Sequence, residues 1–340
     1  MLALIAAALF ASHQTVPVPG ATQVAILGKQ IVALSDGKAT FLRADATGKF
    51  VAQETVAAGA QPLGTAVGDF GDGKPGLAIG DHNQKQVTLL LGGQARAVAA
   101  QVTPHAHHLA AADFDGDGHL DLALHDMGGR RALILWGPSF TQSTAATTGS
   151  TGHAYFNLAA ADFDGDGAPD LALACWPRGE VSVLLGDGPK KRGFHRGPLL
   201  QLPNPAFFVA AADFDGDGKQ DLAVATFSGS ESDLSRDGIA LFRGDGHGAF
   251  AKPLLSASGP GPTSLATGDF NGDGIADLAV GNQGAPQVTL LLGGRGGLSA
   301  APRARLAHPA QGLAVGDLDG DGKADLAVAT GEAIEIFLTK

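Results

Sequence analysis

The residues best suited to chemistry in this 340-residue sequence are aspartates that recur at fixed positions of a short glycine-containing loop. The loop reads D-x-[DN]-x-D-G-x-x-D, with acidic or amide groups at positions 1, 3, 5 and 9, and one copy begins at Asp113. Glycines at positions 4 and 6 permit a sharp turn, and oxygens that converge within such a turn favour a hard cation. Four side-chain oxygens, the carbonyl of position 7 and water give six or seven ligands. That number suits Ca²⁺ better than Mg²⁺, which prefers an octahedron.

Five copies of the loop are complete and a sixth is degenerate. The predicted side-chain ligands are Asp113, Asp115, Asp117, Asp121; Asp162, Asp164, Asp166, Asp170; Asp213, Asp215, Asp217, Asp221; Asp269, Asn271, Asp273, Asp277; and Asp317, Asp319, Asp321, Asp325. The predicted carbonyl ligands are His119, Ala168, Lys219, Ile275 and Lys323. The sixth loop begins at Asp69, is one residue shorter and has Gly76 in place of the last ligand, so we predict no tight site there.

Two other interpretations of the loops were weighed. An EF-hand needs a bidentate Glu at position 12, but that position is apolar in all five loops: Leu124, Leu173, Val224, Val280 and Val328. The alternative without metal is a set of solvated Asx-turns, in which aspartates bind only nearby backbone amides. Ca²⁺ is the prediction, and this alternative stays open.

Charge favours an occupied site. The chain has 34 acidic and 23 basic residues, a formal charge of −11, and 19 of the acidic residues are in ligand positions of the five loops. Carboxylates so close together repel one another without a cation. About five Ca²⁺ ions would bring the charge close to zero. The acidic balance also argues against a nucleic-acid partner.

The loops recur at a spacing typical of propeller blades. Their first aspartates are separated by 44 to 56 residues. Between the loops, short apolar stretches alternate with Gly-rich turns, as in residues 207–250, and give four expected strands per repeat. The phenylalanine after the first aspartate recurs as Phe70, Phe114, Phe163, Phe214 and Phe270, and we expect these side chains in the blade core.

The sequence therefore predicts an all-β chain, a seven-bladed β-propeller of four-stranded blades. Six blades carry the loop or its degenerate form, and one blade precedes them. The last repeat ends before a fourth strand, so an N-terminal strand over residues 13–19 is predicted to complete it and remove the open edge. The predicted blades are 20–60, 61–103, 104–154, 155–206, 207–262, 263–309 and 310–340, within one domain over 13–340.

The recurrent DFDGDGxxDLA segment resembles the FG-GAP/VCBS repeat family, which is also found in the propeller of integrin alpha subunits and in some fungal lectins. The resemblance covers about residues 60–340, and QGAP at Gln283–Pro286 is the nearest trace of the FG-GAP signature itself. It implies a calcium ion in the loop between the first two strands of a blade, with a structural role.

Residues 1–11 are apolar and have the length of a signal-peptide core. We therefore predict a signal peptide over residues 1–12 and a protein that is secreted, periplasmic or at the cell surface. The alternatives are a mis-set start or a first strand of the fold. No segment has the length of a membrane span. The single cysteine, Cys175, excludes a disulfide framework, and we expect it in the core.

The face opposite the calcium loops is the predicted ligand surface. There, residues five and six positions before each first aspartate should surround the channel mouth: Leu63/Gly64, His107/His108, Phe156/Asn157, Phe207/Phe208, Thr263/Ser264 and Gln311/Gly312. The predicted contacts on this face are His107, His108, His125, Arg130, Trp176, Arg178, Phe207, Phe208 and Arg236, because exposed aromatic and polar groups suit sugars or polar peptides. Packing between blades, or simple solvation, is the alternative explanation for these residues.

No nucleophile elbow, zinc-protease helix, phosphate loop or dinucleotide fingerprint is present. The sequence predicts a calcium-stabilised, non-catalytic module for a glycan or an extracellular protein. A carbohydrate-active, lyase-like enzyme and a pure scaffold in a cell-surface assembly are the alternatives.

Overall fold

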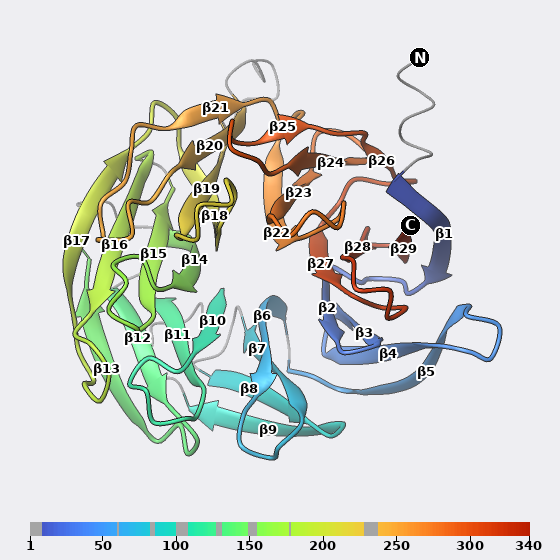
Figure 1. Ribbon diagram of the computed structural model, residues 1–340. Helices are drawn as coiled ribbons and strands as arrows, with labels where there is room; N and C mark the ends of the chain where they lie inside the picture. The colour runs from blue at the N-terminus through green and yellow to red at the C-terminus, as the bar shows by residue number, and fades with distance from the viewer. Residues whose placement is uncertain are drawn as a thin grey trace.

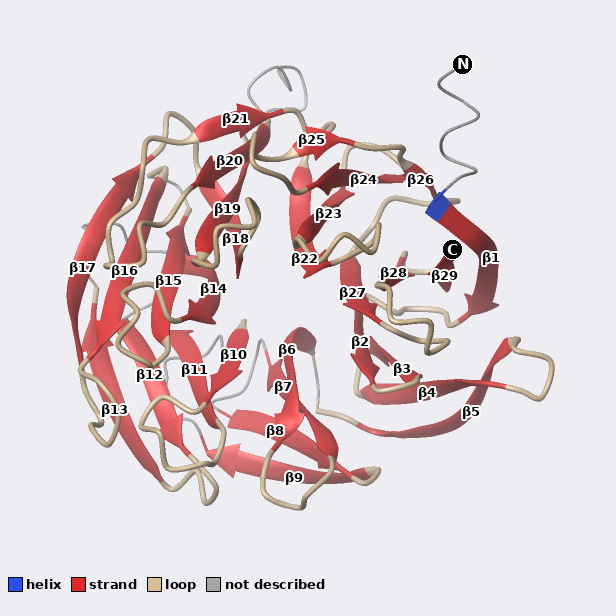
Figure 2. Ribbon diagram, in the orientation of Figure 1, coloured by secondary structure: helices blue, strands red, loops and turns tan. Residues whose placement is uncertain are grey.

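The computed structural model describes residues 9–59, 61–81, 86–99, 108–126, 131–148, 155–176, 178–227 and 237–340. Seven antiparallel sheets stand around a common centre (Figure 1). Every named element is a β-strand, joined to the next by loops and turns (Figure 2). The chain is a seven-bladed β-propeller, as the repeat spacing predicts.

Blades 1 to 4 each consist of four consecutive strands. Blade 1 contains β2 (Gln23–Leu27), β3 (Gln30–Ser35), β4 (Lys38–Ala44) and β5 (Phe50–Ala57). Blade 2 contains β6 (Pro62–Asp69), β7 (Pro75–Asp81), β8 (Gln86–Leu91) and β9 (Gln94–Ala99). Blade 3 contains β10 (Leu109–Ala112), β11 (Asp121–Asp126), β12 (Arg131–Trp136) and β13 (Gln142–Thr147). Blade 4 contains β14 (Tyr155–Ala161), β15 (Asp170–Cys175), β16 (Glu180–Gly186) and β17 (Phe194–Gln201).

The later blades have shorter outer strands or borrow one from the N-terminus. Blade 5 contains β18 (Ala206–Ala212), β19 (Asp221–Thr226), β20 (Gly238–Phe242) and β21 (Leu254–Ser256). Blade 6 contains β22 (Pro262–Gly268), β23 (Asp277–Asn282), β24 (Gln287–Leu292), and the short β25 (Ser299–Ala300) and β26 (Ala304–Arg305), which both pair with β24. Blade 7 contains β27 (Gly312–Gly316), β28 (Asp325–Ala329), β29 (Ala333–Thr339) and β1 (Phe10–Pro17).

The N-terminal strand closes the ring, as predicted. β1 pairs antiparallel with β29, and His13 lies opposite Phe337. β1 begins at Phe10, so it includes three residues of the segment that we predict to be a signal peptide. The pairing joins the two ends of the chain and removes an exposed sheet edge.

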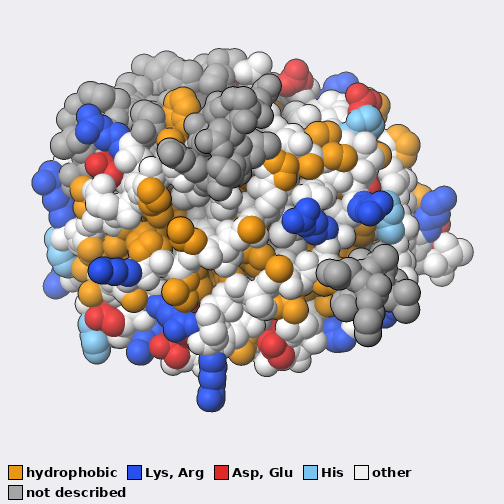
Figure 3. Space-filling view, turned by 90° about the horizontal axis from the view of Figure 1, so that it is seen from above, with side chains coloured by type: hydrophobic (Ala, Val, Ile, Leu, Met, Phe, Trp, Pro, Cys, Tyr) orange, Lys and Arg blue, Asp and Glu red, His pale blue; other side chains and the backbone are white. Residues whose placement is uncertain are grey.

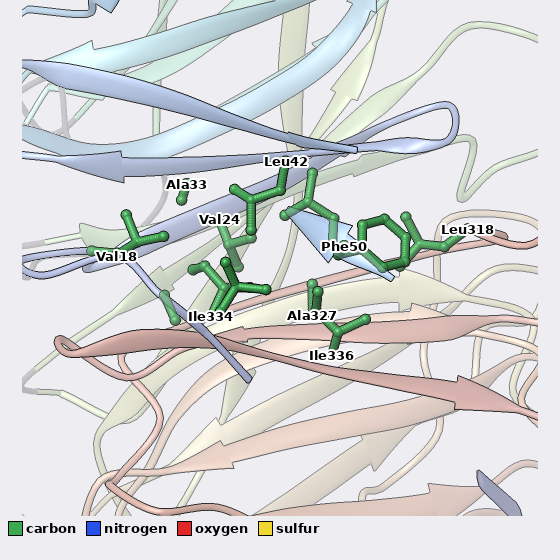
Figure 4. Packing of buried hydrophobic residues seen from close by; sticks show 13 residues of the cluster. Val18, Val24, Ala33, Leu42, Phe50, Leu318, Ala327, Ile334 and Ile336 are labelled. Atoms are coloured by element: carbon green, nitrogen blue, oxygen red, sulfur yellow. The ribbon is translucent and has the colours of Figure 1, made fainter. Parts of the chain in front are cut away.

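The core lies between neighbouring blades. The five phenylalanines that follow the first aspartates are each at most 2% exposed, which confirms their place in the core. Figure 4 shows the cluster between blades 7 and 1, where Val24 and Leu42 face Ile334 and Ile336. Cys175 is fully buried in β15, as expected.

Candidate metal loops and the opposite face

The five complete loops join the first strand of a blade to the second. In blade 4 the loop lies between β14, which ends at Ala161, and β15, which begins at Asp170. Because the five blades have the same strand order, their loops lie on one face of the ring. We call this the loop face.

The aspartate at position 9 is the buried anchor of each loop. In blade 4, Asp170 Oδ2 accepts a hydrogen bond from the Phe163 amide at 2.7 Å, and Oδ1 accepts one from the Gly186 amide at 2.7 Å. The other four loops repeat both bonds at 2.7–3.1 Å, through Asp121, Asp221, Asp277 and Asp325. Each of these carboxylates is at most 1% exposed. The anchor therefore ties the loop to the end of the third strand.

Positions 1 and 5 shape the turn. Asp162 accepts the amides of Gly165 and Gly167 at 2.7 and 3.0 Å, and both glycines have a positive φ, 77° and 87°. Such a backbone is strained for any residue with a Cβ, which explains the glycines. Asp166 Oδ1 accepts the Ala168 amide at 2.8 Å.

Carboxylates of positions 1, 3 and 9 converge in four loops, where one oxygen from each lies within 4.8 Å of the others. The converging sets are Asp113, Asp115, Asp121; Asp162, Asp164, Asp170; Asp213, Asp215, Asp221; and Asp317, Asp319, Asp325. The loop of Asp269 has an amide, Asn271, at position 3. The aspartates at position 5 (Asp117, Asp166, Asp217, Asp321) belong to none of these sets, and each binds the amide of position 7. In these four loops three acidic side chains can therefore bind one ion. That the position 5 carboxylate and the position 7 carbonyl also bind it stays a prediction.

Ionising the buried aspartates at position 9, the anchors, is energetically unfavourable. Burial, more than the neighbouring carboxylates, raises the pKa of Asp170 to about 7. The pKa values of Asp121, Asp221 and Asp277 rise to about 6 for the same reasons, and that of Asp325 also rises. A cation between positions 1, 3 and 9 would offset this cost, and an all-oxygen set fits a hard divalent ion.

Two arginines that the sequence reasoning missed contact position 3. Arg192, in the turn after β16, lies with Nε 2.6 Å from Asp115 Oδ2 of the preceding blade. Arg243, after β20, lies with Nε 3.1 Å from Asp215 Oδ2. Both arginines follow the third strand of a blade, but Arg192 contacts the loop of the preceding blade and Arg243 the loop of its own blade. No repeated position in the sequence therefore signals the two contacts.

The degenerate loop lacks a buried anchor. Asp69 Oδ1 accepts the amides of Gly71, Asp72 and Gly73 at 2.9–3.1 Å. A Cβ at Gly76 would lie 2.7 Å from Leu91, so packing there leaves no room for a carboxylate. Asp69 belongs to none of the converging acidic sets of the described residues.

The opposite face contains a cavity of about 970 Å³ at the centre of the ring. Leu63, His108, Phe207, Phe208, Thr263 and Gln311 line it, all from positions predicted to surround the channel mouth. Gln23, Gln61, His308 and Glu332 also line it and were not predicted. Gln61 and His308 precede the predicted positions Leu63 and Gln311 by two and three residues. Gln23 lies in blade 1, which has no aspartate loop to count from, and Glu332 lies in the turn between β28 and β29.

The other predicted contacts are placed differently. Trp176 is 40% exposed, with its ring edge-on to Phe207 at 6.1 Å between centroids, and Arg178 is exposed nearby in the chain. His125, the penultimate residue of β11, is fully buried, so its predicted contact with a ligand at the surface is wrong. Second strands are buried along their whole length, as β15, β19 and β23 show. Asn157 accepts the Val209 amide at 2.9 Å and links blades 4 and 5. His107, Arg130 and Arg236 lie outside the described residues.

Solved structures share the architecture. BBS1N in complex with ARL6DN aligns over 98% of both chains at 14% identity, with a TM-score of 0.65. Hydrazine synthase from Kuenenia stuttgartiensis aligns over 96% of this chain and 98% of its own at 14% identity, with a TM-score of 0.64. The N-terminal domain of Nup159 aligns over 97% and 94% at 12% identity, with a TM-score of 0.61. At these identities the likeness concerns the fold alone.

Sequence comparison provides the family. No curated protein matches the chain significantly. Among the described residues, no helix has the length and apolar character of a membrane span. The model of the FG-GAP-like repeat matches four overlapping segments, residues 113–173, 163–224, 213–280 and 269–328. Three of the matches begin at the first aspartate of a loop and one begins a residue later, at Phe163, and all four end in the second strand of the next blade. The chain belongs to the FG-GAP-like repeat family.

Proposed function

We propose that this protein is a calcium-stabilised, non-catalytic binding module that acts outside the cytoplasm. The observation that carries the calcium part is the convergence of three carboxylates in four loops, with one of the three fully buried. A buried carboxylate that shares its site with two others is unfavourable alone, and a divalent ion would compensate it. Open loops of this kind suit the high calcium concentration outside cells.

Calcium would act as a structural staple. The position 9 carboxylate already joins the loop to the end of the third strand, as Asp170 joins Phe163 to Gly186. An ion held by positions 1, 3 and 9 would fix the ends of three strands in each of the metal-bearing blades. Ligand binding to the folded state alone stabilises it by mass action, by about 2.7 kcal/mol per site at a hundredfold excess over Kd.

The face opposite the loops is the proposed contact surface for a glycan or an extracellular protein. Its support is the central cavity, with aromatic and polar residues side by side in its wall. The solved propellers BBS1N, in complex with ARL6DN, and Nup159, bound to Dbp5, contact protein partners, so a propeller of this architecture can serve as a binding surface.

Elemental analysis and thermal unfolding test the calcium part. We expect about five Ca²⁺ per chain and a clear loss of Tm on chelation. Asp164→Ala should lower the stoichiometry by one, whereas Asp72→Ala, in the degenerate loop, should leave it unchanged. Metal-free protein with the same Tm in chelator would mean that the loops are only Asx-turns.

A further inference from the structure

The central cavity has a definite chemical character. It receives described residues from six blades, all except blade 4, and lies at the starts of the inner strands. Its volume of about 970 Å³ is at the upper end of the roughly 300–1,000 Å³ typical of small-ligand sites. A ligand on the axis of the ring would therefore contact several blades at once.

One wall of the cavity is aromatic. Phe208, which is half-buried, meets the His108 ring edge-on, with 5.1 Å between centroids. Phe207 lies beside it at 6.0 Å, and Phe227 and Trp176 support Phe207 edge-on at 5.7 and 6.1 Å. These contacts restrict the orientation of the two phenylalanines while leaving part of each accessible from the cavity. Partly accessible rings of this kind bind C–H surfaces.

The remaining wall is rich in uncharged polar groups. Four glutamines line it, Gln23, Gln61, Gln283 and Gln311, together with Thr22 and Thr263. An amide side chain both donates and accepts hydrogen bonds, so it pairs equally well with either role of a hydroxyl group.

Apart from two histidines, His108 and His308, the ionisable groups in the lining are acidic. Asp36 and Glu332 line the cavity, and no lysine or arginine is among its described lining residues. A carboxylated or sulfated ligand would lose its hydration there and gain no cationic partner. The lining therefore disfavours anions.

We infer that the central cavity binds an uncharged oligosaccharide, whose C–H faces lie against Phe207 and Phe208 and whose hydroxyls pair with the glutamine amides. This inference rests on the proposed function and specifies its ligand. Saccharides combine apolar faces with many hydroxyls, which is the combination that the two walls offer. A peptide would find the amides but would need no aromatic wall opposite them.

The test uses the full chain loaded with Ca²⁺, on an array of neutral and acidic glycans, followed by titration calorimetry with the best neutral hexasaccharide and with hexagalacturonate. We expect neutral binding only, and a loss of about tenfold in affinity for Phe208→Ala. Gln311→Ala, at an exposed position, should also weaken binding and guards against a folding defect in the phenylalanine variant. Leu255→Ala is the matched control, because Leu255 is 70% exposed on β21, the outermost strand of blade 5. Figure 3 shows that hydrophobic and charged side chains are mixed on the side of the ring.

The outcomes are distinct. No neutral binding, a preference for hexagalacturonate, or equal affinity of the two cavity variants and wild type would each overturn the inference. So would a protein ligand whose binding Gln311→Ala abolishes in the absence of any glycan binding. Calcium stoichiometry and Tm are measured on the same samples, so a failure of the cavity inference with five bound Ca²⁺ leaves the calcium part of the proposed function intact.

Discussion

Replacing Arg192 with glutamine should increase the metal affinity of the Asp115 loop. Arg192 Nε lies 2.6 Å from Asp115 Oδ2, and a terminal nitrogen lies 3.7 Å from Asp117 Oδ2. The Lys190 amide also donates to the Asp115 carbonyl at 2.6 Å, so the turn of blade 4 covers the loop of blade 3. The Asp115 carboxylate would therefore contact both the guanidinium and the proposed ion.

The expected size follows from this geometry. An ion at about 2.4 Å from an Asp115 oxygen would lie roughly 5 Å from the guanidinium. Repulsion between one and two charges at 5 Å is about 1.7 kcal/mol in water. The Arg192 side chain is 41% exposed, so the aqueous value is appropriate. We therefore expect about a 16-fold gain in affinity at this one site.

Terbium luminescence can isolate the site. The Arg192 guanidinium carbon lies 5.1 Å from the centre of the Trp136 ring, so Trp136 is near enough to sensitise Tb³⁺ at the Asp115 loop. The sequence has two tryptophans, and a Trp176→Phe background removes the other. Titration of sensitised emission then gives the affinity. Lys191→Gln, which removes the same charge from the same turn, is the control for long-range effects.

An unchanged or weaker affinity in Arg192→Gln would refute the reasoning. A weaker affinity would show in addition that Arg192 holds Asp115 in position to bind the ion. Sensitised emission that is absent in every variant would contradict metal binding at this loop altogether.

Three further results are expected. Asp170→Ala leaves the Phe163 and Gly186 amides without acceptors and should lower the free energy of unfolding in metal-free buffer by about 2–4 kcal/mol, measured by urea denaturation against Asp72→Ala. In metal-free protein the anchor carboxylates have raised pKa values, about 6 to 7, above those of the unfolded chain, so the folded state binds more protons and Tm should rise as the pH falls from 8 to 5. Calcium-loaded protein should show the opposite trend below about pH 6, because protons compete with the ion; a Tm that is flat in metal-free buffer would contradict this. His13→Ala removes the 2.9 Å contact with the buried Glu335. It should lower the free energy of unfolding by only about 1–2 kcal/mol, because the His13 side chain is 44% exposed. Thr15→Ala, an exposed position on the same strand, should lower it by less than about 0.5 kcal/mol, the usual effect of a surface substitution.

The sequence was sufficient for the parts of the molecule that repeat. Five loops in register established the blade length, and the absent fourth strand after Phe337 predicted the closing role of the N-terminus, which β1 fulfils. Local spacing also placed Phe207 and Gln311 at the channel mouth. Local spacing could not predict the burial of His125, because the burial of a residue near the end of a second strand depends on packing against the neighbouring blades. Nor could it pair Arg192 with Asp115, which are far apart in sequence and meet only because adjacent blades interlock.

The blades differ in how much hydrophobic burial contributes to their stability. The inner strands of blades 3, 4 and 5 end in three successive alanines, β10 being Leu109–Ala112, so they bury little apolar area for their length. Blade 1 has no acidic loop, and its seam with blade 7 is closed by larger side chains such as Ile31, Leu42 and Phe50. Alanine at the centre leaves room for a channel, but it removes hydrophobic stabilisation from three of the five blades that carry complete loops. The buried carboxylates of those blades, joined to the third strand and compensated by a cation, would replace it from the loop face.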